Sequence, residues 1–236
     1  MAKRELELSP RLQLLADWVP QGARLVDVGT DHAHLPLWLA LNGRVSFAIA
    51  SDLRKGPLER AKENGARYGV ENVEYRLCNG LASIRPEEVD TISIAGMGGE
   101  TIAAILEAAP WTKHERYTLL LSPHTKSEIL REWLANNGYR IRREALIDDR
   151  NTLYPVMEVE KGEMTLSLGQ IWGGAKLLHD PAGDRYLIQR IVRLQGAVAG
   201  ANRSSTEADR EKADQTREVI TALLGMREEY RHVNGT

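Results

Sequence analysis

Short runs of β-branched and aliphatic residues alternate with amphipathic stretches over the first two thirds of this 236-residue sequence. The runs lie at residues 24–28, 45–51, 73–77, 91–95 and 117–121, and helical patterns follow at residues 35–41, 56–68, 101–106 and 129–134. Such alternation is typical of a parallel sheet covered by helices. A helical pattern at residues 6–18 precedes the first run, and runs at residues 139–147 and 153–160 predict a closing antiparallel pair. We therefore expect an α/β fold with a sheet of seven strands.

The composition changes after Lys161, where strand patterns end and Glu, Arg, Gln and Ala become frequent. We predict a first domain over residues 1–161 and a helical domain over residues 162–236. Apolar residues recur at helical spacing in two segments of the second domain, which we expect to form an antiparallel hairpin joined by residues 200–205. The two apolar faces consist of Leu187, Ile188, Ile191, Leu194 and Val198, and of Val219, Ile220, Leu223 and Leu224.

The composition excludes several classes of protein. Mean hydropathy is -0.37, and no apolar run approaches the roughly 20 residues that cross a membrane. The opening MAKRELELSP lacks the apolar core of a signal peptide, so we expect a cytoplasmic protein without membrane contact. Cys78 is the only cysteine and no Cys/His cluster has metal-ligand spacing, so we expect neither a disulfide nor a metal site. With a net charge of -2, binding of a nucleic acid requires a local basic face.

Polar and glycine residues follow each predicted strand, at the edge where a doubly wound sheet binds ligands. The first strand ends in Asp27-Val28-Gly29-Thr30-Asp31-His32, where Gly29 permits close backbone approach. The second ends at Asp52, whose carboxylate suits the two hydroxyls of a ribose. Asn79-Gly80 follows the third strand, and Gly96-Met97-Gly98-Gly99 follows the fourth. Together these residues predict a nucleoside site at one edge of the sheet.

This pattern favours a positively charged nucleoside over a dinucleotide or a nucleoside triphosphate. Asp31 and Ala33 occupy positions where a pyrophosphate needs bare backbone, and the sequence has no Gly-Lys-Ser/Thr triplet. An acidic turn repels phosphate but suits the ammonium and sulfonium groups of S-adenosylmethionine. We therefore expect S-adenosylmethionine as the cofactor.

Several longer segments carry a resemblance to a known family. They read LSPRLQLLADWV, DVGTDHAHLP, ASDLRKGPLERA, DTISIAGMGGETIAAIL and LSPHTKSEILREWLANNGYRI. With these segments and its helical tail, the sequence resembles the bacterial tRNA (adenine-22-N1)-methyltransferases, a class I S-adenosylmethionine-dependent family, over nearly its whole length. The resemblance implies a Rossmann-like catalytic domain, a C-terminal helical coiled-coil domain that binds tRNA, and methyl transfer to N1 of adenine 22 in the D-arm of tRNA.

The sequence departs from the family pattern at two places. Cys78-Asn79-Gly80 stands where the family usually has Gly-Asp before Gly, so an amide oxygen replaces a carboxylate as the expected contact to the cofactor's adenine. Trp172-Gly173-Gly174 stands where a Gly-Pro pair is expected.

The residues and the resemblance together predict three sets of site residues. Asp31 and His32 are the expected catalytic pair, because a carboxylate beside the methyl group stabilises the cation that forms on the base. Substrate contacts are expected from the basic segment 176–203, and His124 and Cys78 are expected to be a loop residue and a small buried residue. The cofactor set is Asp27, Gly29, Thr30, Asp52, Leu53, Asn79, Gly80, Ala95, Gly96 and Met97, and the substrate set is Arg11, Gly98, Gly99, Lys176, Arg190 and Arg193.

Two alternatives stay open at this point. One is an S-adenosylmethionine-dependent methyltransferase that acts on a small molecule. The other is a non-catalytic tRNA-binding or protein-binding module on a relic Rossmann domain, against which the paired acids Asp27 and Asp52 weigh. With tRNA as the expected partner, we expect the chain to act as a monomer.

Overall fold

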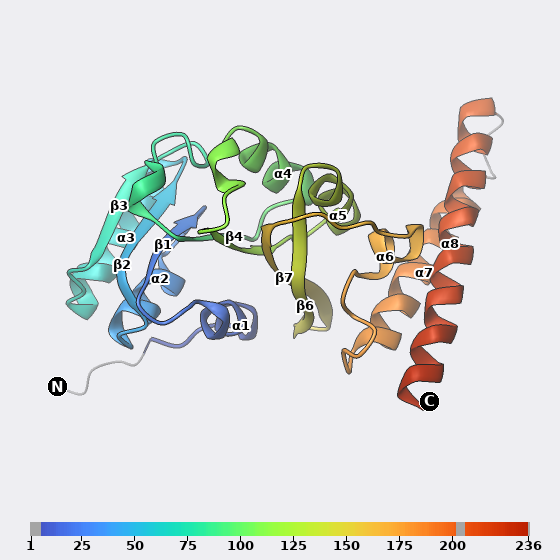
Figure 1. The fold of residues 1–236 in the computed structure, drawn as a ribbon, viewed down its shortest axis with the longest axis horizontal. Helices are drawn as coiled ribbons and strands as arrows, with labels where there is room; N and C mark the ends of the chain where they lie inside the picture. The colour runs from blue at the N-terminus through green and yellow to red at the C-terminus, as the bar shows by residue number, and fades with distance from the viewer. Residues whose placement is uncertain (1–5, 202–205, 236) are drawn as a thin grey trace. The chain divides into compact units, whose positions relative to one another are not determined.

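The computed structural model describes residues 6–201 and 206–235, and a seven-stranded sheet is the central element of these residues (Figure 1). The strands are β1 (Ala23–Val28), β2 (Val45–Asp52), β3 (Val73–Leu77), β4 (Thr91–Ala95), β5 (Thr118–Ser122), β6 (Tyr139–Asp149) and β7 (Thr152–Lys161). The accompanying helices are α1 (Pro10–Trp18), α2 (His34–Leu41), α3 (Lys55–Tyr68), α4 (Gly99–Glu107) and α5 (Ser127–Asn136). Two short 3₁₀ helices, η1 (Pro86–Glu88) and η2 (Pro110–Thr112), lie in the connections.

The order of the strands in the sheet is β3-β2-β1-β4-β5-β7-β6. β1 pairs in parallel with both β2 and β4, and the register places Asp27 opposite Ala50 and Ser93. The β2–β3 and β4–β5 pairs are also parallel, whereas β5 and β7 are antiparallel. A turn with positive φ at both Arg150 and Asn151 joins β6 to β7, as a type I′ hairpin requires. The predicted α/β class with seven strands is confirmed.

The central strands carry continuous apolar runs because helices cover both faces of a parallel sheet. Leu25 and Val26 of β1, Ile49 of β2 and Ile92 and Ile94 of β4 are fully buried. Each aliphatic side chain buried in this way contributes about 1.5–3 kcal/mol relative to an exposed one. This burial fixes the positions of the strand ends, where the polar residues lie.

The first helix begins later than the sequence pattern predicts. α1 starts at Pro10 and not at Leu6, because the Ser9 hydroxyl accepts a hydrogen bond from the Leu12 amide (3.4 Å) and Pro10 occupies the first turn. A proline disfavours helical conformation in the residue before it. Leu6 and Leu8 still pack on the core, but from a non-helical segment.

A second group of helices follows the sheet, consisting of α6 (Leu168–Gly173), α7 (Gly183–Ala201) and α8 (Glu207–Asn234). α7 and α8 are antiparallel, since Asp184 near the start of α7 pairs with Arg227 near the end of α8 (2.6 Å). Their shared core includes Leu187, Leu223 and Tyr230. The predicted helical hairpin is therefore confirmed.

Two details of that hairpin differ from the prediction, and one short helix before it was not predicted. Ile188 and Leu224 are exposed, because each lies one position beyond a fully packed leucine and a helix turns by about 100° per residue. Gly200 belongs to α7, and residues 202–205, including Arg203, lie outside the described residues. The sequence analysis also missed α6, which begins at Ser167 with a capping box formed with Gln170.

The described residues divide into two compact units. One comprises the described part of Met1–Arg143 together with Ile147–Met164, and the other comprises Glu144–Leu146 with the described part of Thr165–Thr236. This division falls three residues after the predicted boundary at 161. Residues 144–146 group with the helices because the Glu144 carboxylate accepts hydrogen bonds from the amides of Ala175 (2.7 Å) and Lys176 (3.1 Å).

The start of α4 provides a test of the packing around the sheet. A Cβ added to Gly99 would lie 2.1 Å from the backbone oxygen of Lys126, whereas one added to Gly98 would lie 3.2 Å from the Thr125 hydroxyl. We expect Gly99→Ala to lower the free energy of unfolding by about 1–3 kcal/mol, although alanine is the better helix former, because backbone cannot move aside as a side chain can. Gly98→Ala is the matched control and should have a much smaller effect in urea denaturation. Equal stability of the two variants would contradict this packing.

Candidate functional site

A cavity of about 550 Å³ opens along the carboxyl edge of the sheet. It is lined by residues at or just after the ends of five strands, β1 to β5, and by side chains of α1, α2 and α4. The carboxyl ends of parallel strands lie side by side, and the strand order reverses between β1 and β4. Open α/β sheets bind ligands at such a switch point. The cavity therefore occupies the position where the sequence predicts a site.

The turn after β1 has an unusual backbone. Gly29, Asp31 and Ala33 all have positive φ, at 73°, 48° and 57°. For non-glycine residues this conformation costs on the order of 1–3 kcal/mol, and such residues concentrate at functional sites. The amides of Gly29 and Thr30 both donate to the Ser51 carbonyl (2.9 Å each), so the end of β2 holds the turn in place.

Asp27 is buried in the wall of the cavity, with 6% of its surface exposed. Burial raises the pKa of its carboxyl to about 6, although the nearby hydroxyls of Thr30 and Ser93 and the charge of Arg11 partly offset the rise. The Thr30 and Ser93 hydroxyl oxygens are buried and form no regular hydrogen bond with any described residue. The wall thus holds the Asp27 carboxylate beside the Thr30 hydroxyl, and Ser93 lies behind them in the interior.

Asp31 and His32 lie at the exposed side of the same cavity. The Asp31 carboxylate is 60% exposed and is 3.7 Å from both the Arg60 guanidinium and the His32 imidazole. The His32 ring stacks on His34 at a centroid distance of 5.5 Å. Burial and the neighbouring His32 lower the pKa of His34, so this ring is neutral at pH 7. Because the Asp31 carboxylate is exposed and lines the cavity, it is accessible both to solvent and to a ligand.

Asp52 ends β2 and is almost fully buried. One carboxylate oxygen accepts a hydrogen bond from the Arg54 amide (2.8 Å), which fixes the direction of the side chain. Asn79 and Gly80 lie after the neighbouring strand β3 and line the same cavity. The ends of two neighbouring strands thus bring a carboxylate and an amide side chain to one cavity.

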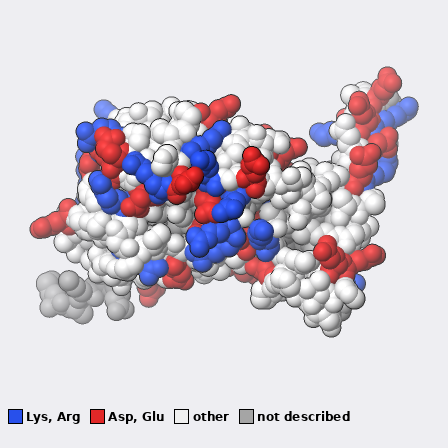
Figure 2. All heavy atoms as spheres, in the orientation of Figure 1, with Lys and Arg blue, Asp and Glu red and all other residues white. Residues whose placement is uncertain are grey.

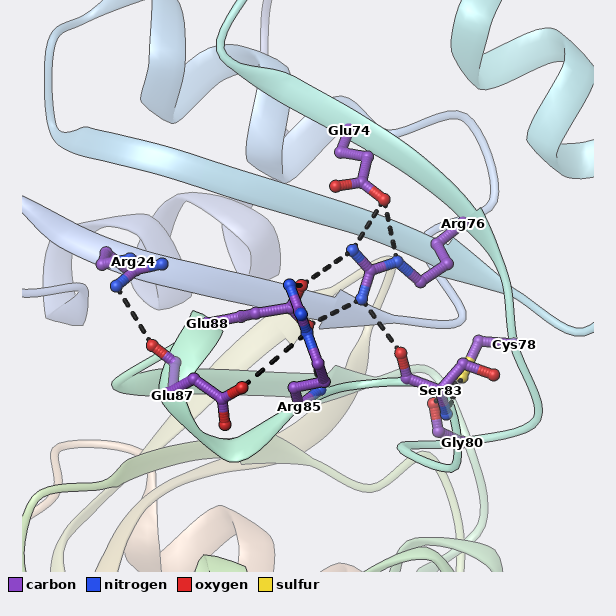
Figure 3. A network of polar contacts seen from close by, with 9 residues as sticks. All are labelled: Arg24, Glu74, Arg76, Cys78, Gly80, Ser83, Arg85, Glu87 and Glu88. Atoms are coloured by element: carbon purple, nitrogen blue, oxygen red, sulfur yellow. Dashed lines mark hydrogen bonds and ion pairs between the residues drawn. The ribbon is translucent and has the colours of Figure 1, made fainter.

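A network of charged side chains holds the loop that carries Asn79 (Figure 3). Arg76 in β3 lies between Glu74 and Glu88 and also donates to the Ser83 carbonyl (3.0 Å). The Cys78 sulfur accepts a hydrogen bond from the Ser83 amide (3.2 Å), which closes the loop on itself. Hydrogen bonds from Arg76 and from the Arg85 backbone lower the pKa of Glu88 to about 2, so this carboxylate is charged throughout the physiological range.

Side chains from distant parts of the sequence meet at the β4–β5 side of the cavity. Arg11 of α1 and His124 after β5 both line it, and the His124 ring lies 4.8 Å from the ring of Tyr154 in β7. The His124 amide donates to the Met97 carbonyl (2.8 Å), which joins the loops after β4 and β5. Partial burial and the charge of Arg11 lower the pKa of His124, so this imidazole is neutral at pH 7.

Comparison with known proteins agrees with this geometry. Residues 8–157 match the family model described as a methyltransferase domain. The chain is 37% identical over 177 residues to the tRNA (adenine(22)-N(1))-methyltransferase of Bacillus subtilis, and the match spans 72% of this chain and 74% of that protein. The chain belongs to the tRNA (adenine(22)-N(1))-methyltransferase family.

Solved structures of the family superpose on this methyltransferase over nearly its whole length. The crystal structure of the B. subtilis m1A22 tRNA methyltransferase gives a TM-score of 0.86 at 31% identity and covers 94% of this chain and 100% of that one. A putative tRNA (m1A22) methyltransferase of Streptococcus pneumoniae, in complex with S-adenosyl-L-methionine, gives a TM-score of 0.83 at 32% identity with the same coverage. The resemblance inferred from the sequence segments is confirmed.

The methyltransferase's cavity brings most of the predicted site residues together. Its lining includes Arg11, Asp27, Gly29, Thr30, Asp31, His32, Asp52, Leu53, Asn79, Gly80, Ala95, Gly96 and Met97. Gly98 and Gly99 are not among the lining residues, and Gly99 packs on the Lys126 backbone. Gly29 was expected to allow close approach of a ligand to the backbone. In the structure the Met97 side chain occupies the space that a Cβ would need, since its Cε would lie 2.3 Å away.

The three predicted substrate residues of the tail belong to the helical unit. Arg190 stacks over the Trp172 ring at 5.2 Å and lies 6.0 Å from the Tyr186 ring, so its side chain is engaged within that unit. Lys176 and Arg193 are exposed. A contact of these residues with RNA stays a prediction.

Two histidines outside the predicted site set, His34 and His124, also line the cavity, and the sequence analysis expected His124 only as a loop residue. His124 follows β5 by two residues, so its place at the carboxyl edge was available as a signal. The contact between His124 and Tyr154 could not be predicted in this way, because it depends on β7 lying between β5 and β6 in the sheet.

Among the residues that the structure describes, no helix combines the length and the apolar character needed to span a lipid bilayer. Within residues 6–201 and 206–235, no three His, Cys, Asp or Glu side chains are grouped closely enough to hold a metal ion.

The raised pKa of Asp27 predicts a dependence of stability on pH. Its folded value of about 6 exceeds the ordinary 3.8, so the wild type loses stability as pH rises from about 4 to 6. We expect Asp27→Asn to remove this loss and to raise the free energy of unfolding at pH 8 by about 1–3 kcal/mol. Urea denaturation of both proteins at pH 4, 6 and 8 measures the difference, with the exposed Asp17→Asn as control. An unchanged difference across these pH values would show that Asp27 titrates normally.

The lowered pKa of Glu88 predicts the opposite behaviour. Its contribution is fully present above about pH 4.5 and is lost as pH falls through about 2. We expect Glu88→Gln to lower the free energy of unfolding at pH 7 by about 1–3 kcal/mol, because Arg76 loses a charged acceptor. The deficit relative to wild type should shrink below pH 4. Glu87→Gln changes an exposed neighbour and serves as control; a similar deficit in both variants would argue against a special role of Glu88.

Proposed function

We propose that this chain transfers the methyl group of S-adenosylmethionine to N1 of adenine 22 in tRNA. The observation that carries the proposal is the 37% identity, over nearly three quarters of each chain, to the B. subtilis enzyme of that name. The cavity at the switch point of the sheet supports it, because its lining has the charges that a sulfonium nucleoside requires. A methyltransferase that acts on a small molecule has no comparable support.

The residues of the cavity fit S-adenosylmethionine. Asp52 suits the ribose hydroxyls, and Asn79, after the next strand, suits an edge of the adenine ring. Asp27 and the Thr30 hydroxyl line the cavity and suit an ammonium group. When bound, the cofactor supplies an activated methyl group.

The acceptor atom needs no general base. N1 of adenine has an in-plane lone pair at neutral pH, so the task of the protein is to orient the base in line with the methyl group, which can lower the barrier by about 7–11 kcal/mol. Because N1 lies on the pairing edge, adenine 22 must leave its stack before reaction. The side of the cavity formed by Gly96, Met97 and His124 offers a wall for it, and the neutral His124 ring does not oppose the charge that develops on the base.

The methylated base is a cation, and Asp31 is the carboxylate with access to it. Its side chain is 60% exposed at the cavity and is held by Arg60 and His32. A carboxylate in this place favours the transition state in which the positive charge forms. Asp31 thus acts on turnover, whereas Asp52 acts on cofactor affinity.

The helical unit is the proposed tRNA-binding part of the chain, with Lys176 and Arg193 as exposed basic residues. Basic and acidic side chains are interspersed on the face seen in Figure 2. Because the net charge is -2, contacts to phosphates depend on such local groups and should weaken steeply with salt.

The proposed activity is tested by incubation of the protein with labelled S-adenosylmethionine and unmodified tRNA, followed by nucleoside analysis. We expect 1-methyladenosine at position 22, and no incorporation into the same tRNA with guanosine at that position. Absence of 1-methyladenosine from the first tRNA, or equal labelling of both, would overturn the proposal.

The roles of the two acids can be separated by substitution. We expect Asp31→Asn to lower turnover at least tenfold with little change in affinity for S-adenosylhomocysteine, because the charge matters only when the base becomes cationic. Asp52→Asn should weaken S-adenosylhomocysteine binding at least tenfold, since charged hydrogen bonds to hydroxyls are lost. Calorimetric titration and single-turnover kinetics measure the two effects. A reversal of the pattern would refute the assignment.

A further inference from the structure

The sheet unit has a group of basic side chains at the start of α3, beside the cavity. The group consists of Arg54, Lys55 and Arg60, and we call these three residues the α3 rim. Arg54 lines the cavity itself, and Lys55 is the next residue along the chain. The Arg60 guanidinium lies close to Gly56, since a Cβ there would be 3.9 Å from its Nη1 atom. All three side chains of the α3 rim are exposed.

The packing of α3 determines that these cations face solvent. Pro57, Leu58 and Ala61 are buried, so the first two turns of the helix present only their other side to solvent. Residues 54–62 contain four basic side chains and a single acidic one, Glu59. In a chain with a net charge of -2, this segment is a local concentration of positive charge.

The charges of the α3 rim are only loosely matched within the protein. Arg54 Nε lies 3.8 Å from the Asp52 carboxylate, and Arg60 Nη2 lies 3.7 Å from the Asp31 carboxylate. These distances allow attraction but are too long for hydrogen bonds. The Lys55 ammonium forms no ion pair or hydrogen bond with any described residue. The α3 rim therefore retains N–H donors for an acceptor from outside the protein.

An RNA that delivers a base to this cavity needs cations at the entrance. Three carboxylates line the cavity, those of Asp27, Asp31 and Asp52, and each of them repels phosphate. The target base cannot enter without bringing phosphates close to these carboxylates, because the flanking phosphates are joined to its own ribose. Cations beside the cavity offset this repulsion and leave its acidic interior unchanged.

We propose that the α3 rim binds the RNA backbone on one side of the target adenine, with Lys55 and Arg60 donating to phosphate oxygens. This inference rests on the proposed function and adds to it a phosphate site in the sheet unit, separate from the basic residues of the helical unit. Arg60 then contacts a phosphate while it remains close to Asp31, so one guanidinium serves two anions.

The first test measures the affinity for tRNA as a function of salt, by filter binding. We expect Lys55→Gln and Arg60→Gln each to weaken tRNA binding about three- to tenfold near 0.1 M salt. Each should also reduce the slope of log affinity against log salt by about 0.7–0.9, the contribution of one phosphate contact. Affinity for S-adenosylhomocysteine should stay within twofold of wild type, because neither side chain lines the cavity.

Lys62→Gln is the matched control for these variants. Lys62 is exposed and lies seven residues after Lys55, so it is on the same face of α3 but two turns further along the helix. We expect this variant to bind tRNA with an affinity within twofold of wild type.

The second test identifies the group that is bound. The tRNA is assembled with one neutral methylphosphonate linkage, either directly before or directly after adenine 22. The altered RNA and its reference both carry a 2′-O-methyl group on the ribose before that linkage, which keeps the linkage stable. We expect one of the two linkages to weaken binding to wild type at least threefold. The same linkage should have less than a twofold effect on the double variant Lys55→Gln/Arg60→Gln, because the interaction is then missing from both sides.

Three results would overturn the proposal. Losses of affinity no larger than that of Lys62→Gln would show that α3 attracts RNA only through its overall charge. A neutral linkage that acts equally on wild type and on the double variant would place the phosphate at other residues. A fall in turnover without loss of tRNA affinity would make Arg60 a positioning residue for Asp31. Failure of the wild type to form 1-methyladenosine, with the affinity losses as expected, would instead refute the proposed function and leave the RNA contact in place.

Discussion

The parallel pairing of β1 with β2 on one side and β4 on the other is the constraint on which the site depends. It places Asp27, Asp52 and the glycine at the end of β4 along one edge, although they are far apart in the sequence. The continuous apolar burial of these strands keeps the edge rigid, because a shift in register would move buried side chains out of the core. The rigid strands therefore fix the positions of the polar groups at their ends.

The cavity carries electrostatic features that are unfavourable for the protein alone. Asp27 has a raised pKa because it is buried, Arg11 has donors without acceptors, and Asp31 and Ala33 adopt positive φ. A ligand with complementary charges would satisfy Asp27 and Arg11, so its binding would stabilise the folded protein. The ion-pair network around Arg76 lies outside this set. Its charges are matched within the protein, and it holds the loop of Asn79 without taking part in the chemistry.

The two compact units differ in how they use charge. Both units contain internal ion pairs, such as Arg76 with Glu88 in the sheet unit and Asp184 with Arg227 and Arg231 in the helical unit. The sheet unit in addition gathers opposite charges at one cavity. The hydrogen bonds of Glu144 to the amides of residues 175 and 176 place a short piece of β6 within the helical unit. The division into units therefore does not follow the chain at a single point.

The sequence by itself determined the alternation of strands and helices, the acids at the ends of β1 and β2 and the family, because local periodicity and short segments encode these features. It also indicated the cofactor, since the absence of a phosphate-binding turn and the presence of Asp31 can be read directly. The tertiary structure alone decided which distant residues come together: Arg11 and Asp27 at one cavity, His124 with Tyr154, and Gly99 with the Lys126 backbone. These contacts depend on the order of the strands and on the packing of α1. Strand order and helix packing result from burial of the whole core, and local patterns in the sequence do not specify them.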